Sequence, residues 1–407
     1  MAVSTTFDRP VATPVADRPL MNPGPAVLAV LAITAAAVYL DSAISGRQSL
    51  LFLVGTFAGI VLYHASFGFT SSWREFLLEG RGAGIRAQML MLALTCIVFF
   101  PVLGSGHAGA QAVRGSVSPA GVSVIVGAFM FGVGMQLGGG CASGTLYTAG
   151  GGNTRMLATL AAFIAGSVIG TRHAGWWSAM PAAKPTSLIT LFGAYGGLAL
   201  SLTLFALIAF VSLQIERERH PFGVSLTANR HRDSRGGWRL LRGPWPLAAG
   251  AIGLAIVNIA TLYLSGRPWG VTGAFALWGA RISAAAGVPI ASWPYWTAPA
   301  QAASLKAPLA ADITTVMDIG IILGALAAAA AAGRFAPTWR VPMRSLAAAI
   351  VGGLLLGYGA RIAYGCNIGA YFSGIASGSL HGWLWMVAAM GGNAMGAVLR
   401  PAFGLRR

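Results

Sequence analysis

Cys141 and Cys366 are the two side chains of this sequence best suited to hold a soft anion. Each opens a short, glycine-rich apolar segment, directly after Gly140 or Gly365. A helix start has unpaired backbone N–H groups and the positive end of the helix dipole, so it favours an anion. A thiol adds a weak S–H donor and a polarisable sulfur. The pair predicts a site for a large, soft anion. Both groups are expected to be thiols, because a thiolate would repel an anion.

Four polar side chains near the cysteines are further candidates for this site. They are Tyr147, Asn153, Arg361 and Asn367. Arg361 either attracts anions or extends to lipid headgroups. The asparagines either donate to an anion, cap a helix or join helices. Tyr147 either contacts the substrate or only packs against other side chains.

The remaining candidate residues and motifs do not indicate a cofactor. Asp318 lies inside an apolar run, where an acid either pairs with an arginine or takes part in proton coupling. Cys96 is interpreted as a small buried hydrophobic residue. The sequence contains no phosphate-binding loop, no HExxH motif and no His or Cys cluster. We therefore predict no metal and no cofactor.

The composition indicates a polytopic helical membrane protein. Only 9% of the 407 residues are charged and 56% are hydrophobic, whereas about 25% of a soluble domain is charged. A soluble enzyme, a disordered chain and a disulfide scaffold are excluded. The net charge is +17, but the basic residues lie in short gaps between apolar runs. That distribution is typical of a bilayer protein and argues against nucleic-acid binding.

Ten apolar runs are long enough to cross a bilayer, for which a helix needs about 20 residues. They are 26–44, 49–66, 86–104, 120–137, 156–172, 188–212, 246–265, 313–333, 345–362 and 381–399. Four shorter apolar segments have glycine near their starts: 67–79, 138–152, 268–282 and 363–378. They predict four re-entrant half-helices, because ordinary loops would carry more charge. The fold class is therefore all-α.

The basic residues orient this fold. Residues 214–244 contain seven arginines, which predicts a cytoplasmic loop. Alternation of the spans across the membrane then places both termini in the cytoplasm, with 19 basic residues inside and 7 outside.

Residues 1–25 are polar and proline-rich and predict a disordered tail. The first half is then 26–213 and the second half is 245–407.

An internal repeat relates the two halves. GVGMQLGGGCASGTLYTAG (132–150) aligns with GYGARIAYGCNIGAYFSGI (357–375) when Cys141 is placed on Cys366, 225 residues later. Several glycines coincide in this alignment, which is unlikely by chance.

Two further matches extend the repeat. The same shift places Gly166 on Gly391, and FGFTSSW (67–73) matches WGVTGAF (269–275) more weakly. The repeats cover about 49–172 and 246–399. One span, 188–212, separates them and reverses the second. An inverted-topology repeat is typical of transporters and channels whose substrate site lies near the bilayer midplane.

These motifs resemble the YeeE/YedE sulfur-transport family. The resemblance rests on GGGCASGTLYTAGGGN (138–153) and GYGARIAYGCNIGAYFSGIASGSLHGW (357–383), and more loosely on 67–73 and 268–279. It covers roughly residues 49–400 and implies an hourglass-shaped protein of the bacterial inner membrane. It also implies that Cys141 and Cys366 line a narrow midplane path and pass thiosulfate by S–H···S contacts. A small cytoplasmic sulfur-carrier protein is an implied partner.

We therefore expect a thiosulfate importer without enzymatic activity. One alternative is transport of another sulfur or selenium species, such as sulfite or sulfide. Another is a membrane sulfurtransferase with a persulfide on one cysteine, although no general base is evident beside either. A structural or assembly subunit is disfavoured by the repeat with two polar centres. The basic loop 214–244 is either a docking surface or a topology anchor.

Overall fold

Ten long helices form the body of the protein. The computed structural model describes residues 21–221 and 239–406. The long helices are α1 (Pro23–Ala43), α2 (Gly46–Ala65), α4 (Ala83–Ser105), α5 (Val122–Gly138), α7 (Arg155–Arg172), α9 (Leu188–Arg219), α11 (Leu247–Ser265), α15 (Ile313–Ala331), α16 (Met343–Ile362) and α18 (Leu380–Leu399). Each corresponds to one of the ten predicted apolar runs.

The four shorter apolar segments also fold as helices. They form α3 (Phe69–Arg74) with the π-helix η2 (Glu75–Glu79), α6 (Ala142–Gly150), α12 (Thr272–Ala285), and the π-helix η5 (Asn367–Phe372) with α17 (Ser373–Ala376). The remaining helices are α8 (Ala174–Ser178), α10 (Arg239–Arg242), α13 (Pro294–Thr297), α14 (Pro299–Lys306), η3 (Ile290–Ser292), η4 (Leu309–Ala311) and η6 (Arg400–Phe403).

Four two-residue strands interrupt this helical fold. β1 (His107–Ala108) pairs antiparallel with β2 (Gln111–Ala112), and β3 (Ala120–Gly121) pairs antiparallel with β4 (Ala182–Ala183). In register, His107 lies opposite Ala112 and Ala120 lies opposite Ala183. The strands only close connections between helices, so the fold is essentially all-α.

Local sequence sets the helix ends. Ser45 and Asp312 cap α2 and α15 through side-chain oxygens that accept from Gln48 N and Thr315 N. At C-termini, Gly106 ends α4 with a φ of 78°, a conformation that glycine adopts at little cost. The predicted boundaries are therefore close to the observed ones.

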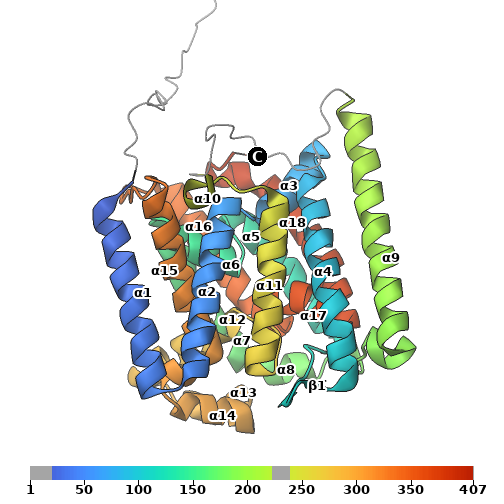
Figure 1. Ribbon diagram of the computed structural model, residues 1–407, viewed down its shortest axis with the longest axis horizontal. Coiled ribbons are helices and arrows are strands. Elements are labelled where there is room, and N and C mark those ends of the chain that lie inside the picture. The colour runs from blue at the N-terminus through green and yellow to red at the C-terminus, as the bar shows by residue number, and fades with distance from the viewer. Residues whose placement is uncertain (1–20, 222–238, 407) are drawn as a thin grey trace, which may run out of the picture.

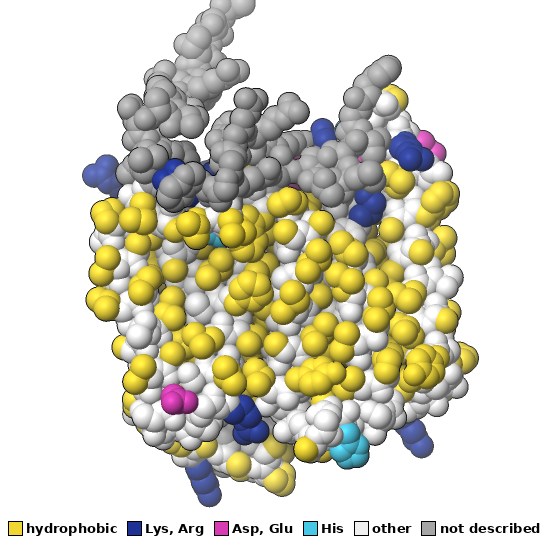
Figure 2. All heavy atoms as spheres, in the orientation of Figure 1, with side chains coloured by type: hydrophobic (Ala, Val, Ile, Leu, Met, Phe, Trp, Pro, Cys, Tyr) yellow, Lys and Arg dark blue, Asp and Glu magenta, His cyan; other side chains and the backbone are white. Residues whose placement is uncertain are grey.

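The protein is a multi-pass membrane protein. Within residues 21–221 and 239–406, nine helical segments are long and apolar enough to cross a membrane. Four of them join a long helix to the short helix that follows: α2 with α3 and η2, α5 with α6, α16 with η5 and α17, and α18 with η6. The predicted span 156–172 forms α7 but is not among the nine. Figure 2 shows hydrophobic side chains in a broad band, with charged groups near its two edges.

Two predicted boundaries are corrected. The tail predicted for 1–25 lies outside the described residues up to position 20, but Pro23–Pro25 already belong to α1. Proline at the first helical position fixes a helical φ and needs no N–H partner, which explains this earlier start. The loop predicted for 214–244 begins later, because α9 continues to Arg219. Its central part, 222–238, lies outside the described residues.

The helices pack so that the two halves of the chain interlock. α2 packs on α15 and α11, and α11 packs on α4. α5 packs on α16 and α18, and α16 packs on α7. Among the short helices, α3 contacts α18, α12 contacts α7, α6 contacts α15 and α17 contacts α4. α1 and α9 lie at opposite edges of the molecule (Figure 1).

Glycines allow α5 and α16 to touch at the backbone. A Cβ on Gly134 in α5 would lie 2.8 Å from the carbonyl oxygen of Gly352 in α16. A Cβ on Gly359 in α16 would overlap the carbonyl oxygen of Gly127 in α5. No side chain fits at either position without separating the two helices. These glycines, which the sequence repeat aligned, therefore hold the centre of the fold together.

Glycines also allow α7 and α18 to touch α16 and α5 at the backbone. A Cβ on Gly166 in α7 would overlap the carbonyl oxygen of Leu354 in α16, and a Cβ on Gly392 in α18 would overlap that of Phe129 in α5. Gly391, the residue aligned with Gly166, has nothing nearer than a ring carbon of Phe129 at 3.8 Å. The close contact of α18 with α5 is therefore made at Gly392 and not at Gly391.

Buried amides position the short helices. Gln88 on α4 accepts hydrogen bonds from Trp73 Nε1 of α3 at 2.9 Å and from Tyr371 Oη of η5 at 3.3 Å. Asn258 on α11 accepts from the backbone N of Trp269, which precedes α12, at 2.9 Å. It also donates to Ser373 Oγ of α17 at 3.2 Å. Short helices in both halves are therefore tied to long ones by groups that would be costly to leave unpaired.

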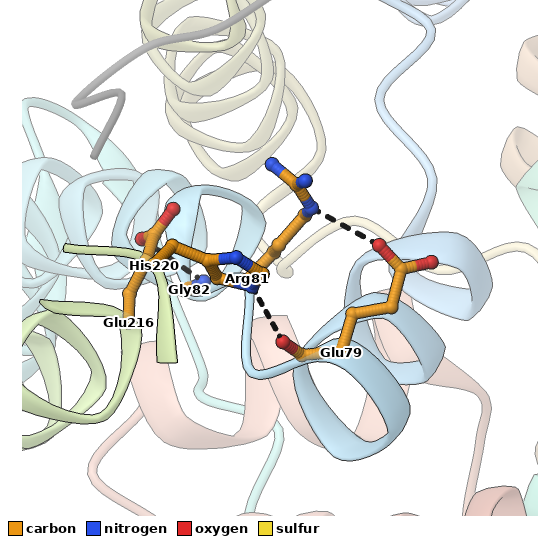
Figure 3. A network of polar contacts seen from close by, with 5 residues as sticks. All are labelled: Glu79, Arg81, Gly82, Glu216 and His220. Atoms are coloured by element: carbon orange, nitrogen blue, oxygen red, sulfur yellow. Dashed lines mark hydrogen bonds and ion pairs between the residues drawn. The ribbon is translucent and has the colours of Figure 1, made fainter. Parts of the chain in front are cut away.

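An ion pair and two hydrogen bonds hold the end of α9 against the start of α4. Figure 3 shows Glu216 and His220 at the end of α9 with their hydrogen-bond partners Gly82 and Glu79. The Glu216 carboxylate lies 2.7 Å from the Arg86 guanidinium, and both side chains are largely buried. The same carboxylate accepts from the Gly82 backbone N at 3.1 Å. His220 hydrogen-bonds to the Glu79 carbonyl oxygen at 2.8 Å. Since α9 packs mainly on α4, these contacts anchor it.

We expect Glu216→Gln to lower the thermal stability of the purified protein. Removing one charge of a buried pair costs about 3–5 kcal/mol, because the other charge is left uncompensated. Glu218→Gln is the matched control, since Glu218 is an exposed acid on the same helix. The measurement is thermal unfolding in detergent, followed by tryptophan fluorescence. Equal midpoints for the two variants would show that the pair does not anchor α9.

Candidate functional site

Cys141 begins α6 at a sharp turn. α5 ends at Gly138, and the guanidinium of Arg155 donates to the Gly138 carbonyl oxygen at 2.9 Å. Gly139 follows with a φ of 91°. Cys141 then has extended backbone, and its Sγ accepts from the Gly144 backbone N at 3.4 Å. The thiol is buried, with 3% of the residue exposed.

Cys366 begins η5 after a more strained turn. Tyr364 and Gly365 have φ values of 60° and 147°. A Cβ at Gly365 would lie 2.8 Å from the Ala370 backbone N, so only glycine fits. The Cys366 carbonyl oxygen accepts from that N at 2.8 Å. The thiol itself makes no capping hydrogen bond within the described residues, although the residue is buried.

The starts of these two short helices come together. α6 and η5 are in contact, and Cys366 lies within electrostatic range of both Cys141 and Asp318. Tyr147 on α6 lies within electrostatic range of Cys141. Two thiols from distant parts of the chain therefore share one buried region.

A polar cavity of about 260 Å³ lies beside this region. Its lining includes three arginines, Arg114, Arg267 and Arg361, together with Gly365 and Gly369, which flank Cys366. Burial lowers the pKa of the Arg267 guanidinium from its ordinary value, and nearby Arg114 adds to this effect while Asp312 opposes it. Arginine starts from so high a pKa that it stays charged at neutral pH. The cavity is therefore positively charged.

Two of the three arginines were not predicted as site residues. Arg114 lies in the connection after β2 and Arg267 in the connection after α11. The Arg114 backbone N donates to the carbonyl oxygen of Gly266 at 2.9 Å, which joins these two connections. Only their count on one side of the membrane was visible in the sequence. Their meeting depends on tertiary structure.

Of the other predicted site residues, three lie at the cavity or beside the cysteines, and one does not. Arg361 donates to Tyr295 Oη at 2.8 Å, and its guanidinium lies 5.3 Å from that ring. Asn367 is fully buried, and neither atom of its amide has a hydrogen-bond partner within the described residues. Gly140 packs against the first turn of α6. Asn153, however, is exposed beyond the opposite end of α6, so the structure does not bring it to the cysteines.

The fold and this site define a multi-pass helical membrane protein in which an arginine-lined cavity lies beside two buried thiols. The chain belongs to the Sulphur transport family, whose pattern matches residues 64–395.

Named relatives share this assignment. The Thiosulfate transporter TsuA of Spirochaeta thermophila is 30% identical over 355 residues, which are 84% of this chain and 95% of that protein. The Probable transporter YedE of Salmonella typhimurium and that of Escherichia coli are each 32% identical over 161 residues. Those residues are 39% of this chain and 39% of each relative, so the chain matches less than half the length of either YedE.

Proposed function

We propose that this protein imports thiosulfate through a path from the arginine-lined cavity to Cys366 and Cys141. One observation carries the proposal: three arginines line one cavity together with Gly365 and Gly369, the glycines before and after Cys366 in the chain. The similarity to a thiosulfate transporter over 84% of the chain supports the choice of substrate.

The chemistry of the path suits a soft dianion. Arginines at the entrance offset the cost of removing a divalent anion from water. Deeper in the path, thiols offer weak S–H donors and polarisable sulfur. Thiosulfate has one soft terminal sulfur, which matches these groups better than the hard oxygens of sulfate. The Cys366 thiol is buried at the start of η5, where the backbone N–H groups of Ile368 and Gly369 face it.

The internal repeat is part of this proposal. Contacts between elements support it, because exchanging the two halves preserves them: α2 with α15 becomes α11 with α4, and α5 with α18 becomes α16 with α7. The partners of the glycines support it as well. Gly166 approaches Leu354 and Gly392 approaches Phe129, and Phe129 and Leu354 are 225 residues apart. An inverted repeat of this kind places a substrate site between its halves.

We further propose that both termini face the cytoplasm of a bacterial cell. In Figure 1 the start of α1, the end of α9, α10 and the end of α18 lie at one end of the molecule, while α8, α13 and α14 lie at the other. The first end carries most of the basic residues, which favours a cytoplasmic position. The arginine-lined cavity then opens outward. A cytoplasmic sulfur-carrier partner stays a prediction.

Uptake of radiolabelled thiosulfate into proteoliposomes tests the proposed function. We expect uptake that unlabelled thiosulfate blocks and sulfate does not, since sulfate lacks the soft terminal sulfur. Stronger competition by sulfite or a selenium anion than by thiosulfate would reassign the substrate. Absence of uptake by correctly inserted protein would contradict the proposal.

Loss of an entrance arginine should weaken substrate capture more than turnover. We expect Arg114→Gln and Arg267→Gln each to raise the KM for thiosulfate about tenfold, equivalent to about 1.4 kcal/mol, with a smaller change in maximal rate. Arg47→Gln is the matched control, because Arg47 is exposed outside this cavity. An unchanged KM in both cavity variants would remove the arginines from the path.

A further inference from the structure

Asp318 is a buried acid that the path described so far does not use. It lies on α15, is fully buried, and neither carboxyl oxygen has a hydrogen-bond partner within the described residues. Thr314, one helical turn earlier, lines the arginine cavity. Residues four apart lie on one face of a helix, so Asp318 is placed one turn deeper than Thr314. Its electrostatic neighbours include Cys366, and Gly365 and Gly369 on either side of Cys366 in the chain line that cavity.

No cation neutralises this acid within the part of the chain that the structure describes. Its charged neighbour on its own element is another acid, Asp312. The titratable groups on elements packed against α15 include Tyr39 on α1, His64 on α2, Cys141 and Tyr147 at α6, Arg242 on α10 and Arg281 on α12.

Two arginines close to α15 bind other groups. Arg281 donates to the Ala307 carbonyl oxygen, and Arg267 to Thr314 Oγ1 at 3.4 Å. His64 packs against the ring of Trp245. No ion pair of the described residues includes Asp318. Of the two interpretations that the sequence left open, pairing with an arginine therefore has no support.

An ionised carboxylate at this place would be unfavourable for two reasons. An unpaired charge is costly in an apolar, membrane-embedded interior. A negative charge beside Cys366 would also repel an anion that reached the thiol. Both costs disappear when the carboxyl group binds a proton. The neutral acid can then donate a hydrogen bond to the passing anion.

We propose that Asp318 is a proton-binding site that couples inward movement of the anion to inward movement of a proton. The proposal rests on the proposed function, because it requires an anion path past Cys366. The carboxyl group takes a proton from the outer cavity before the anion enters. It releases the proton to the cytoplasmic side after the anion has left. One dianion and one proton cross together, so each cycle carries a net charge of −1.

Accumulation of thiosulfate in proteoliposomes tests this coupling. The membrane potential is clamped at zero with valinomycin and equal potassium on both sides, and the outside is made more acidic. With one proton per anion, the wild-type accumulation ratio should rise about tenfold for each pH unit of gradient. Asp318→Asn, which mimics the neutral acid but carries no proton, should equilibrate thiosulfate without this rise. Asp318→Glu should retain it.

Asp41→Asn is the matched control, since Asp41 is an exposed acid at the end of α1, and should behave as wild type. A wild-type protein that equilibrates thiosulfate but never accumulates it would overturn the proton site and leave the proposed function intact. No wild-type uptake under any gradient would instead contradict the proposed function.

Infrared spectroscopy reports on the proton without transport. The difference spectrum between wild type and Asp318→Asn at neutral pH should contain the C=O band of a protonated carboxylic acid. This measurement decides the case even if Asp318→Asn is inactive. A carboxylate band in its place would overturn the proposal.

Discussion

Cys141→Ala and Cys366→Ala are each expected to reduce thiosulfate uptake to the level of cells without the protein. In the proposed path the substrate passes both thiols, and alanine removes the S–H donor and the polarisable sulfur at that point. The measurement is growth of a bacterium that lacks its own thiosulfate uptake, with thiosulfate as the sole sulfur source. Initial uptake of labelled thiosulfate gives the size of the loss.

Unfolding should not explain this loss. The contact between Cys141 Sγ and Gly144 N is 3.4 Å long and involves a weak acceptor. Its removal should cost no more than a helix cap, about 1 kcal/mol. Cys96→Ala is the matched control: Cys96 is also a free, buried cysteine, and its Sγ contacts the Ile375 carbonyl oxygen at 4.0 Å. It should keep near-wild-type uptake. Full uptake by either path variant, at normal membrane levels, would refute the cysteine path.

Gly392→Ala should destabilise the protein strongly, whereas Gly391→Ala should not. The added methyl at Gly392 would overlap the carbonyl oxygen of Phe129, so α18 must move away from α5. Overpacking of this kind typically costs about 1–3 kcal/mol, and more where backbone blocks the way. At Gly391 the methyl has room, and alanine favours a helix over glycine by about 1 kcal/mol. Thermal unfolding in detergent measures both effects.

The same measurement tests the repeat. A Cβ on Gly166 in α7 would overlap the carbonyl oxygen of Leu354 in α16, just as a Cβ on Gly392 would overlap that of Phe129. Gly166→Ala should therefore lower the unfolding midpoint about as much as Gly392→Ala. If Gly391→Ala were the harmful variant, the assignment of the close contact to Gly392 would be wrong.

The sequence alone was sufficient to predict the long helices and the all-α fold class. α4 runs from Ala83 to Ser105 where 86–104 was predicted, and α11 from Leu247 to Ser265 where 246–265 was predicted. About 20 apolar residues in a row have one stable solution in a bilayer, since every backbone group must be bonded within the helix. The glycines before Cys141 and Cys366 suit the two turns found there, because a positive φ is a local requirement that glycine meets at little cost.

Tertiary structure alone decided what these helices bring together. Arg114, Arg267 and Arg361 are far apart in the chain, and nothing in their local sequence indicates that they line one cavity. That Asp318 has no ion-pair partner among residues 21–221 and 239–406 is likewise a property of helix packing. A local pattern specifies a helix and its ends, because the backbone bonds lie within a few residues. A binding site depends on side chains from separate helices. The relative positions of these helices follow from close contacts such as that between Gly392 of α18 and Phe129 of α5.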